Sequence, residues 1–231
     1  MARKDRAPDP PKRPQGPKRR TTPSGPKDAE RRRRLLYLVG GAGIAALAVA
    51  LAFVFLAGGD TDEREVLEAA GCTLQTAPAA VGEHTAELAA TSDPKWNTDP
   101  PTSGPHHEQP AVWGSYEDPI PFAQSIHNLE HGGIVIHYGD EVPEAEVEAI
   151  RAFYTEDPRG MLVAPLAKLG DQIALSAWTS EEAVLGESGD QGQGFLAKCP
   201  RFDEDAFSTF VDEHRFKGPE RVPPELLTPG S

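Results

Sequence analysis

Five of the seven histidines of this chain lie between positions 106 and 137, and this clustering is the strongest chemical signal in the sequence. Two of them, His127 and His131, are four residues apart, and Gly132-Gly133 follows directly. If the segment Ser125–His131 is helical, that spacing places both imidazoles on one face, a common way to give one metal ion two ligands. The glycines are then expected to end the helix.

A second histidine pair, His106 and His107, follows the stiff segment Pro100–Pro105. We predict that one or both of these side chains meet the His127/His131 pair at a transition-metal ion. Three imidazoles suit copper or zinc, and a thioether from Met161 would favour copper. Met161 is more simply explained as core packing, since buried methionines commonly fill gaps.

His137 follows this cluster on a predicted strand, where it alternates with Ile136 and Tyr138. Its side chain should therefore face away from theirs. The pattern leaves two interpretations of His137 open, a surface residue or a further ligand.

Two other interpretations of the histidine cluster stay open. In the first, no metal binds, and Asn128 and Glu130 anchor the proline-rich loop by satisfying backbone groups of residues 100–107. In the second, His127–His131 is the H-x-x-E-H pattern of zinc hydrolases, whose glutamate activates water. That pattern needs a sustained helix and a distant third ligand, so Gly132-Gly133 argues against it. We therefore predict no catalytic residues.

The rest of the chain must position these side chains, and its pattern predicts an α+β domain. We expect a small mixed or antiparallel sheet of at least three strands and two or three helices. A long ordered proline-rich loop should occupy much of residues 73–122. The expected strands are Ile134–Tyr138, Met161–Pro165 and Ile173–Trp178, and the expected helices are Pro143–Thr155, Asp203–Phe216 and a short amphipathic one at Asp62–Ala70.

Charge divides the chain into two opposed parts. Residues 1–34 hold thirteen Lys/Arg and four Asp/Glu, a net of +9, which leaves ten basic and thirty-two acidic residues, a net of −22, for positions 35–231. The first part has too few apolar residues to fold and is predicted to be a disordered tail. The acidic second part argues against nucleic-acid binding there, since neutralising phosphates needs a basic surface.

Residues 35–57 contain no charged side chain over twenty-three positions. As a helix they would be about 34 Å long, enough for a hydrocarbon core of roughly 30 Å. The arginines before this segment and the acidic residues after it predict a cytoplasmic N-terminus and an extracytoplasmic C-terminal domain. The helix and its basic flank are the parts of the chain expected to contact membrane lipid. A cleaved signal peptide is the alternative. If residues 35–57 span the membrane, residues 58–71 form a juxtamembrane linker.

The chain has only two cysteines, Cys72 and Cys199. At opposite ends of an extracytoplasmic domain they are most simply explained as one disulfide, with free or metal-bound thiols as the alternative. No C-x-x-C spacing is present, so thiol exchange activity has little support.

Four segments of the chain carry a family resemblance: Pro100-Pro101-Thr102-Ser103-Gly104-Pro105-His106-His107, Trp113-Gly114-Ser115-Tyr116, His127-Asn128-Leu129-Glu130-His131-Gly132-Gly133 and Ala177-Trp178. With these segments the chain resembles the DUF3105 family over about Cys72–Phe216. The resemblance implies a bacterial protein with one membrane helix, an extracytoplasmic domain at about residues 72–217, a flexible tail at 218–231, and no established activity.

Overall fold

The computed structural model describes residues 60–85, 96–181 and 191–231. The predicted cytoplasmic tail (1–34) and membrane-spanning helix (35–57) lie outside the described residues. Among the residues that are described, no helix has the length and apolar character needed to cross a bilayer.

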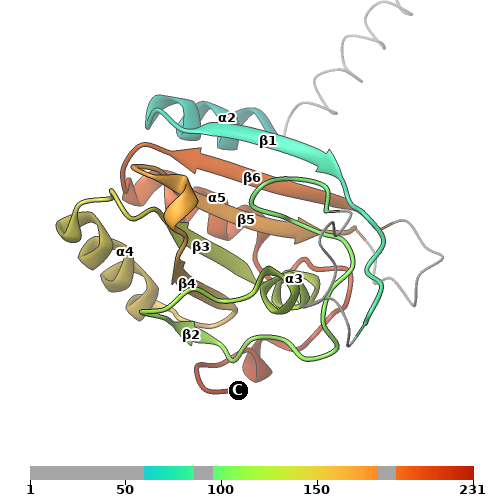
Figure 1. Ribbon diagram of the computed structural model, residues 1–231. Coiled ribbons are helices and arrows are strands. Elements are labelled where there is room, and N and C mark those ends of the chain that lie inside the picture. The colour runs from blue at the N-terminus through green and yellow to red at the C-terminus, as the bar shows by residue number, and fades with distance from the viewer. Residues whose placement is uncertain (1–59, 86–95, 182–190) are drawn as a thin grey trace, which may run out of the picture. The chain divides into compact units, whose positions relative to one another are not determined.

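One six-stranded mixed sheet organises the described domain (Figure 1). Its strand order is β1-β6-β5-β3-β4-β2; β4 pairs in parallel with β3 and β2, and the other pairs are antiparallel. The three predicted strands form its centre. The strands are β1 (Thr73–Pro78), β2 (Gly114–Ser115), β3 (Ile134–Tyr138), β4 (Met161–Pro165), β5 (Ile173–Thr179) and β6 (Gln193–Cys199).

The α+β class is confirmed, but the sequence patterns missed β1, β2 and β6. β1 and β2 are edge strands with largely half-buried or exposed side chains, so neither shows a continuous apolar run. β6 includes Gly194 and a lysine, which interrupt its apolar pattern. These three segments become strands because they pair with strands that are distant in the sequence.

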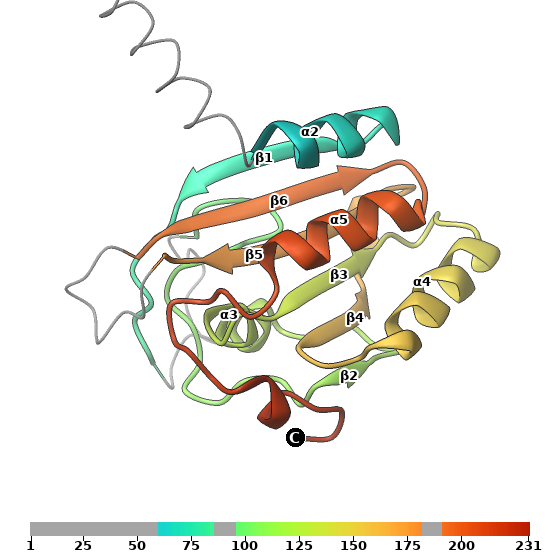
Figure 2. The ribbon, with the colours of Figure 1, turned by 180° about the vertical axis from the view of Figure 1, so that it is seen from behind.

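Within the described residues, four α-helices pack on the sheet, against an expected two or three. They are α2 (Asp60–Ala69), α3 (Phe122–Glu130), α4 (Glu144–Glu156) and α5 (Glu204–His214). Helix α5 has a side-chain N-cap, because the Asp203 side chain accepts a hydrogen bond from the Ala206 amide at 3.1 Å. Figure 2 shows α5 in front of the sheet, whereas Figure 1 shows α3 in front of the opposite face.

Each face of the sheet has its own apolar core. On one face, Leu67 of α2, Ile150 of α4 and Phe207 of α5 pack on alternate residues of the central strands. On the other face, Ile126 and Leu129 of α3 pack on Val135, Leu162 and Trp178. Consecutive strand residues point to opposite faces, so these two cores separate the side chains of neighbouring positions.

Two segments placed outside the domain by the sequence patterns pack against it instead. In the presumed linker, Leu67 is fully buried and Glu63 Oε1 lies 2.8 Å from His214 Nε2 of α5. In the presumed flexible tail, Leu227 is buried and the Trp113 amide donates to the Ser231 carbonyl at 3.0 Å. Both segments have few apolar residues, so only their tertiary contacts reveal that they belong to the domain.

The predicted disulfide between Cys72 and Cys199 is confirmed. Cys72 lies between α2 and β1, and Cys199 ends β6, the strand that pairs with β1. Both residues are buried, and the bond joins positions 127 residues apart. It therefore fixes α2 and the edge strand β1 to the end of β6.

Candidate metal centre

The proline-rich loop and helix α3 bring their histidines together. The His106 and His127 rings are 5.0 Å apart between centroids, and His127 and His131 are 4.5 Å apart. Glu130, on the same helix, places its Oε2 atom 3.0 Å from His106 Nε2. Convergence of the two segments, the condition on which a shared site depends, is thus met.

The loop reaches this position because its backbone is fixed by side chains within it. The Asn97 side-chain carbonyl accepts hydrogen bonds from the amides of Thr102 (3.3 Å) and Ser103 (3.0 Å). The Trp96 indole donates to the Pro105 carbonyl at 2.9 Å. Gly194 of β6 also matters, because a side chain there would begin 2.0 Å from Thr102 Oγ1. These contacts fix the loop on the sheet and bury His106 completely.

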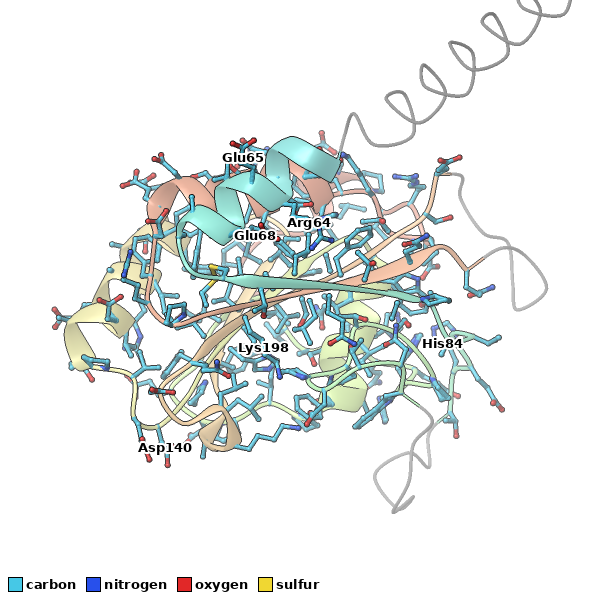
Figure 3. All side chains as sticks on the ribbon, turned by 90° about the horizontal axis from the view of Figure 1, so that it is seen from above. Arg64, Glu65, Glu68, His84, Asp140 and Lys198 are labelled. Carbon is cyan, nitrogen blue, oxygen red and sulfur yellow. A yellow bond between two sulfur atoms is a disulfide. The ribbon has the colours of Figure 1, made fainter. Side chains whose placement is uncertain are left out.

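His84, which the sequence patterns did not single out, is the fourth member of the cluster. The segment after β1 forms a parallel bridge with the loop. In this bridge the His106 amide donates to the backbone carbonyl of Glu83, and the Thr85 amide donates to the backbone carbonyl of His106. This bridge places the His84 and His106 rings 4.5 Å apart and His84 Nε2 3.3 Å from Glu130 Oε2. Figure 3 labels His84 at the end of the domain toward which β1 points, away from Asp140.

Two overlapping groups of ligand atoms result, and they share His127. The inner group is His84, His106, His127 and Glu130; the outer group is His127, His131 and Glu220. Within each group, one ligand atom per residue lies within 4.8 Å of all the others. Glu220, in the C-terminal segment, was also absent from the sequence-based set.

His84 and Glu220 carry no local signal that would have identified them. Each is a single residue in a segment without helical or strand periodicity, and each reaches the cluster through a long-range backbone contact. The Glu220 amide donates to the Glu130 carbonyl at 3.0 Å.

Backbone carbonyls fix the tautomers of two of these histidines. Nδ1 of His106 lies 2.8 Å from the Gly104 carbonyl, and Nδ1 of His127 lies 2.7 Å from the His107 carbonyl. A carbonyl only accepts hydrogen bonds, so each Nδ1 must carry the hydrogen, which leaves the lone pair of the neutral ring on Nε2. Metal-ligating histidines in proteins almost always make this kind of contact through the other ring nitrogen.

The ionisation states suit a cation. Burial lowers the pKa of His127 to about 4, against a smaller opposite effect of its hydrogen bond to the His107 carbonyl. Burial also lowers the pKa of His131, although Glu220 opposes this. Burial raises the pKa of Glu130, but the hydrogen bond and charge of His106, together with the other imidazoles, outweigh it and lower the pKa overall. At neutral pH the His127 and His131 rings are therefore mainly neutral, and the Glu130 carboxylate is ionised.

Two predicted ligands lie apart from both groups. The His107 ring turns away, with its Nδ1 accepting from the Gln109 amide at 3.0 Å, and only its backbone carbonyl reaches the cluster. Met161 is buried in the core on the opposite face of the sheet from Leu162 and Trp178. Among the described residues, the ligand groups thus contain no sulfur atom.

Asn128 has the anchoring role suggested for it, but at a different place. Its amide group pairs with the backbone of Ala111 twice, accepting from the amide and donating to the carbonyl, both at 2.9 Å. The expected partners were residues 100–107. Glu130 contacts the His84 and His106 rings rather than loop backbone.

His137 is neither a surface residue nor a member of either ligand group. It is buried on β3, its ring packs edge-on against Phe122 at 5.7 Å, and neither ring nitrogen has a hydrogen-bond partner. Burial, with a smaller effect of the Lys168 charge, lowers the pKa of His137 to about 4. The neutral ring is therefore strongly favoured in the folded state.

Replacing His137 with leucine is expected to raise stability at acid pH. The unfolded histidine takes up a proton near pH 6.5 and the folded one only near pH 4, so the wild-type protein loses stability as pH falls through this window. The loss from this one residue is on the order of 3 kcal/mol. Urea unfolding of both proteins at pH 7 and pH 4 should show a gap that widens at the lower pH. Equal pH dependence of His137→Leu and wild type would contradict the assignment.

The comparisons with known proteins agree with the resemblance noted in the sequence. No curated protein and no solved structure matches the chain. A family described as a protein of unknown function, DUF3105, matches residues 87–225. The match includes His106, His127, Glu130, His131 and Glu220, while His84 lies just before it. The chain belongs to the DUF3105 family.

Proposed function

We propose that this domain binds one divalent transition-metal ion through the inner group. The observation that carries the proposal is the facing pair His106 and Glu130. His106 donates its Nδ1 hydrogen to a backbone carbonyl, so the lone pair of its Nε2 points at the Glu130 carboxylate from 3.0 Å. Two electron-rich atoms at that separation require a cation between them, either a proton or a metal ion.

The spacing of the ligand atoms favours a metal ion in this place. Zinc binds imidazole nitrogen and carboxylate oxygen at about 2.0–2.2 Å with tetrahedral geometry, which separates neighbouring ligand atoms by about 3.3 Å. Glu130 Oε2 lies 3.0 Å from His106 Nε2 and 3.3 Å from His84 Nε2. The remaining separations between ligand atoms of the inner group are at most 4.8 Å, so the side chains would close further around a bound ion.

The ligand types favour zinc or copper(II). Three imidazoles and one carboxylate suit both ions. The reason to prefer copper over zinc was a thioether ligand, but Met161 lies in the core of the other face of the sheet. At equilibrium copper(II) should bind more tightly than zinc, because this order holds for most nitrogen and oxygen sites.

A binding role fits the inner group better than hydrolysis. Four protein ligands close a tetrahedral site, whereas hydrolytic zinc sites keep one position for water. In the H-x-x-E-H pattern the glutamate acts on water beside the metal, but here Glu130 contacts two imidazoles as a ligand would. Helix α3 also ends at Glu130, with His131 at its C-cap. The anchoring by Asn128 is compatible with a metal site, since it fixes the same helix to Ala111 in the segment that follows the histidine loop.

We also propose that the domain lies outside the cytoplasm, tethered by residues 35–57. The disulfide supports this location, because disulfides persist mainly in oxidising compartments. The charge-free stretch and the arginines before it support the tether.

Binding and its dependence on Glu130 can be measured directly. We expect the full-length chain, freed of metal and titrated with Zn²⁺, to take up one equivalent by isothermal calorimetry and by elemental analysis after gel filtration. Glu130→Gln keeps the size of the side chain but removes its charge. It should weaken binding at least a hundredfold, because it removes the only anionic ligand of the inner group.

The matched control is His107→Gln. His107 is adjacent to His106 and has the same chemistry, but its ring lies outside both groups. Its Zn²⁺ affinity should stay within threefold of wild type. The proposal fails if the wild-type chain retains no zinc, or if His107→Gln weakens binding as much as His106→Gln does.

A further inference from the structure

We infer that the outer group is the loading position of the inner metal site: His131 and Glu220 capture the ion at the surface, and His127 passes it inward. This inference rests on the proposed function. It assigns a role to two side chains that the inner group does not use. Glu220 and His131 also lie on the solvent side of the cluster, with side chains 52% and 16% exposed.

The outer group has the geometry of a second ligand set. His131 Nε2 lies 3.0 Å from His127 Nε2 and 3.0 Å from Glu220 Oε2. One nitrogen therefore faces two acceptors, and a single hydrogen on His131 can satisfy both only in part. A metal ion in that position would be bound by two imidazoles and a carboxylate.

His127 makes the two positions mutually exclusive. Its Nδ1 is occupied by the His107 carbonyl, so only the lone pair on Nε2 remains for a metal. One lone pair binds one ion, so the two groups cannot both use His127 at the same time. An ion held by the outer group can instead keep its bond to His127 while His106 and Glu130 replace His131 and Glu220. The shared ligand thus provides a path without release into solvent.

The protein holds Glu220 in place for this role. The Glu220 amide donates to the Glu130 carbonyl at 3.0 Å, and the Phe216 amide donates to the Gly132 carbonyl at 2.7 Å. Two glycines permit this close crossing of backbones. A side chain at Gly218 would begin 2.2 Å from the Glu130 carbonyl, and Gly132 has a φ of +85°. The crossing fixes the Glu220 carboxylate beside His131.

The competing path runs past His84, whose side chain is 44% exposed. Rates distinguish the two paths, because a loading position changes how fast the ion arrives but not how tightly it is finally held. Glu220→Gln and His131→Gln should therefore slow both uptake and release by the same factor.

The test mixes metal-free full-length chain with Co²⁺ in a stopped-flow instrument and follows the visible absorption of the bound ion. We expect Glu220→Gln and His131→Gln to bind Co²⁺ at least tenfold more slowly than wild type, with equilibrium affinities within threefold. Glu213→Gln is the control. It removes one exposed carboxylate of similar accessibility outside both groups, so it should bind at the wild-type rate.

Three results would overturn the inference while leaving the inner site intact. Unchanged rates in both variants would assign loading to the His84 side. Weaker affinity with faster release would make His131 and Glu220 ordinary ligands of the bound state. Uptake of two equivalents by the wild-type chain would show that the groups fill together. A wild-type chain that binds no Co²⁺ or Zn²⁺ would instead refute the proposed function itself.

Discussion

Removal of the Cys72–Cys199 disulfide is expected to lower the free energy of unfolding by about 5 kcal/mol. The bond closes a loop of 127 residues, and the chain-entropy relation gives about this value for a loop of that length. Because marginal domains have only about 5–15 kcal/mol in total, much of the stability of the domain depends on this one bond. The edge strand β1 and helix α2 should be the first elements to detach.

Denaturant unfolding followed by tryptophan fluorescence provides the measurement, since Trp96, Trp113 and Trp178 all lie in the domain. The two cysteines are the only ones in the chain, so reduction affects no other bond. The Cys72→Ala/Cys199→Ala double variant should behave like the reduced wild type, apart from the packing of two buried sulfur atoms. If the free energy of unfolding falls by less than about 1 kcal/mol in both the reduced wild type and the double variant, β1 and α2 are held by pairing and packing alone.

Asn128→Ala is expected to lower the free energy of unfolding by about 3 kcal/mol. Asn128 is fully buried, and its side chain satisfies both backbone groups of the buried Ala111. Truncation would leave a buried donor and a buried acceptor without partners, and each such group costs about 1–3 kcal/mol. The helix that carries His127 and Glu130 would lose its link to the segment after the histidine loop.

Two further variants isolate this role. Asn128→Asp keeps the shape and the acceptor for the Ala111 amide, but it places a carboxylate oxygen against the Ala111 carbonyl, so it should destabilise the fold at least as much as alanine does. Gln124→Ala, on the same helix but partly exposed, should change stability by less than about 0.5 kcal/mol. Zn²⁺ binding by Asn128→Ala well below its melting temperature should persist. Its complete loss in a folded variant would make Asn128 part of the metal site.

Patterns along the chain predicted the centre of the fold well, because its elements have strong local signals. Strand β4 is a continuous apolar run, β3 is apolar except for His137, and α5 has an aspartate cap and a regular apolar face. The edges were missed for the opposite reason. In β1, with the sequence Thr-Leu-Gln-Thr-Ala-Pro, few side chains are buried, so nothing but its pairing with β6 makes it a strand.

The same distinction applies to the candidate metal centre. The four-residue spacing of His127 and His131 and the adjacent Glu130 were visible because a helix turns residues at that spacing to one side. The choice between His106 and His107 was not visible, since neighbouring residues in an irregular loop point in directions set by its hydrogen bonds. Asn97 and Trp96 fix that loop so that His106 faces Glu130 and His107 faces outward.

By itself, the sequence determined the histidine-rich chemistry, the α+β class, the disulfide and the membership in the DUF3105 family. Only the tertiary structure decided which side chains share a site. It added His84 and Glu220 from segments without periodicity, and it placed Met161 and the His107 ring elsewhere. The physical reason is that spacing along the chain fixes directions only within a helix or strand. Ligands from different segments meet through backbone pairing and close packing between residues that are far apart in sequence.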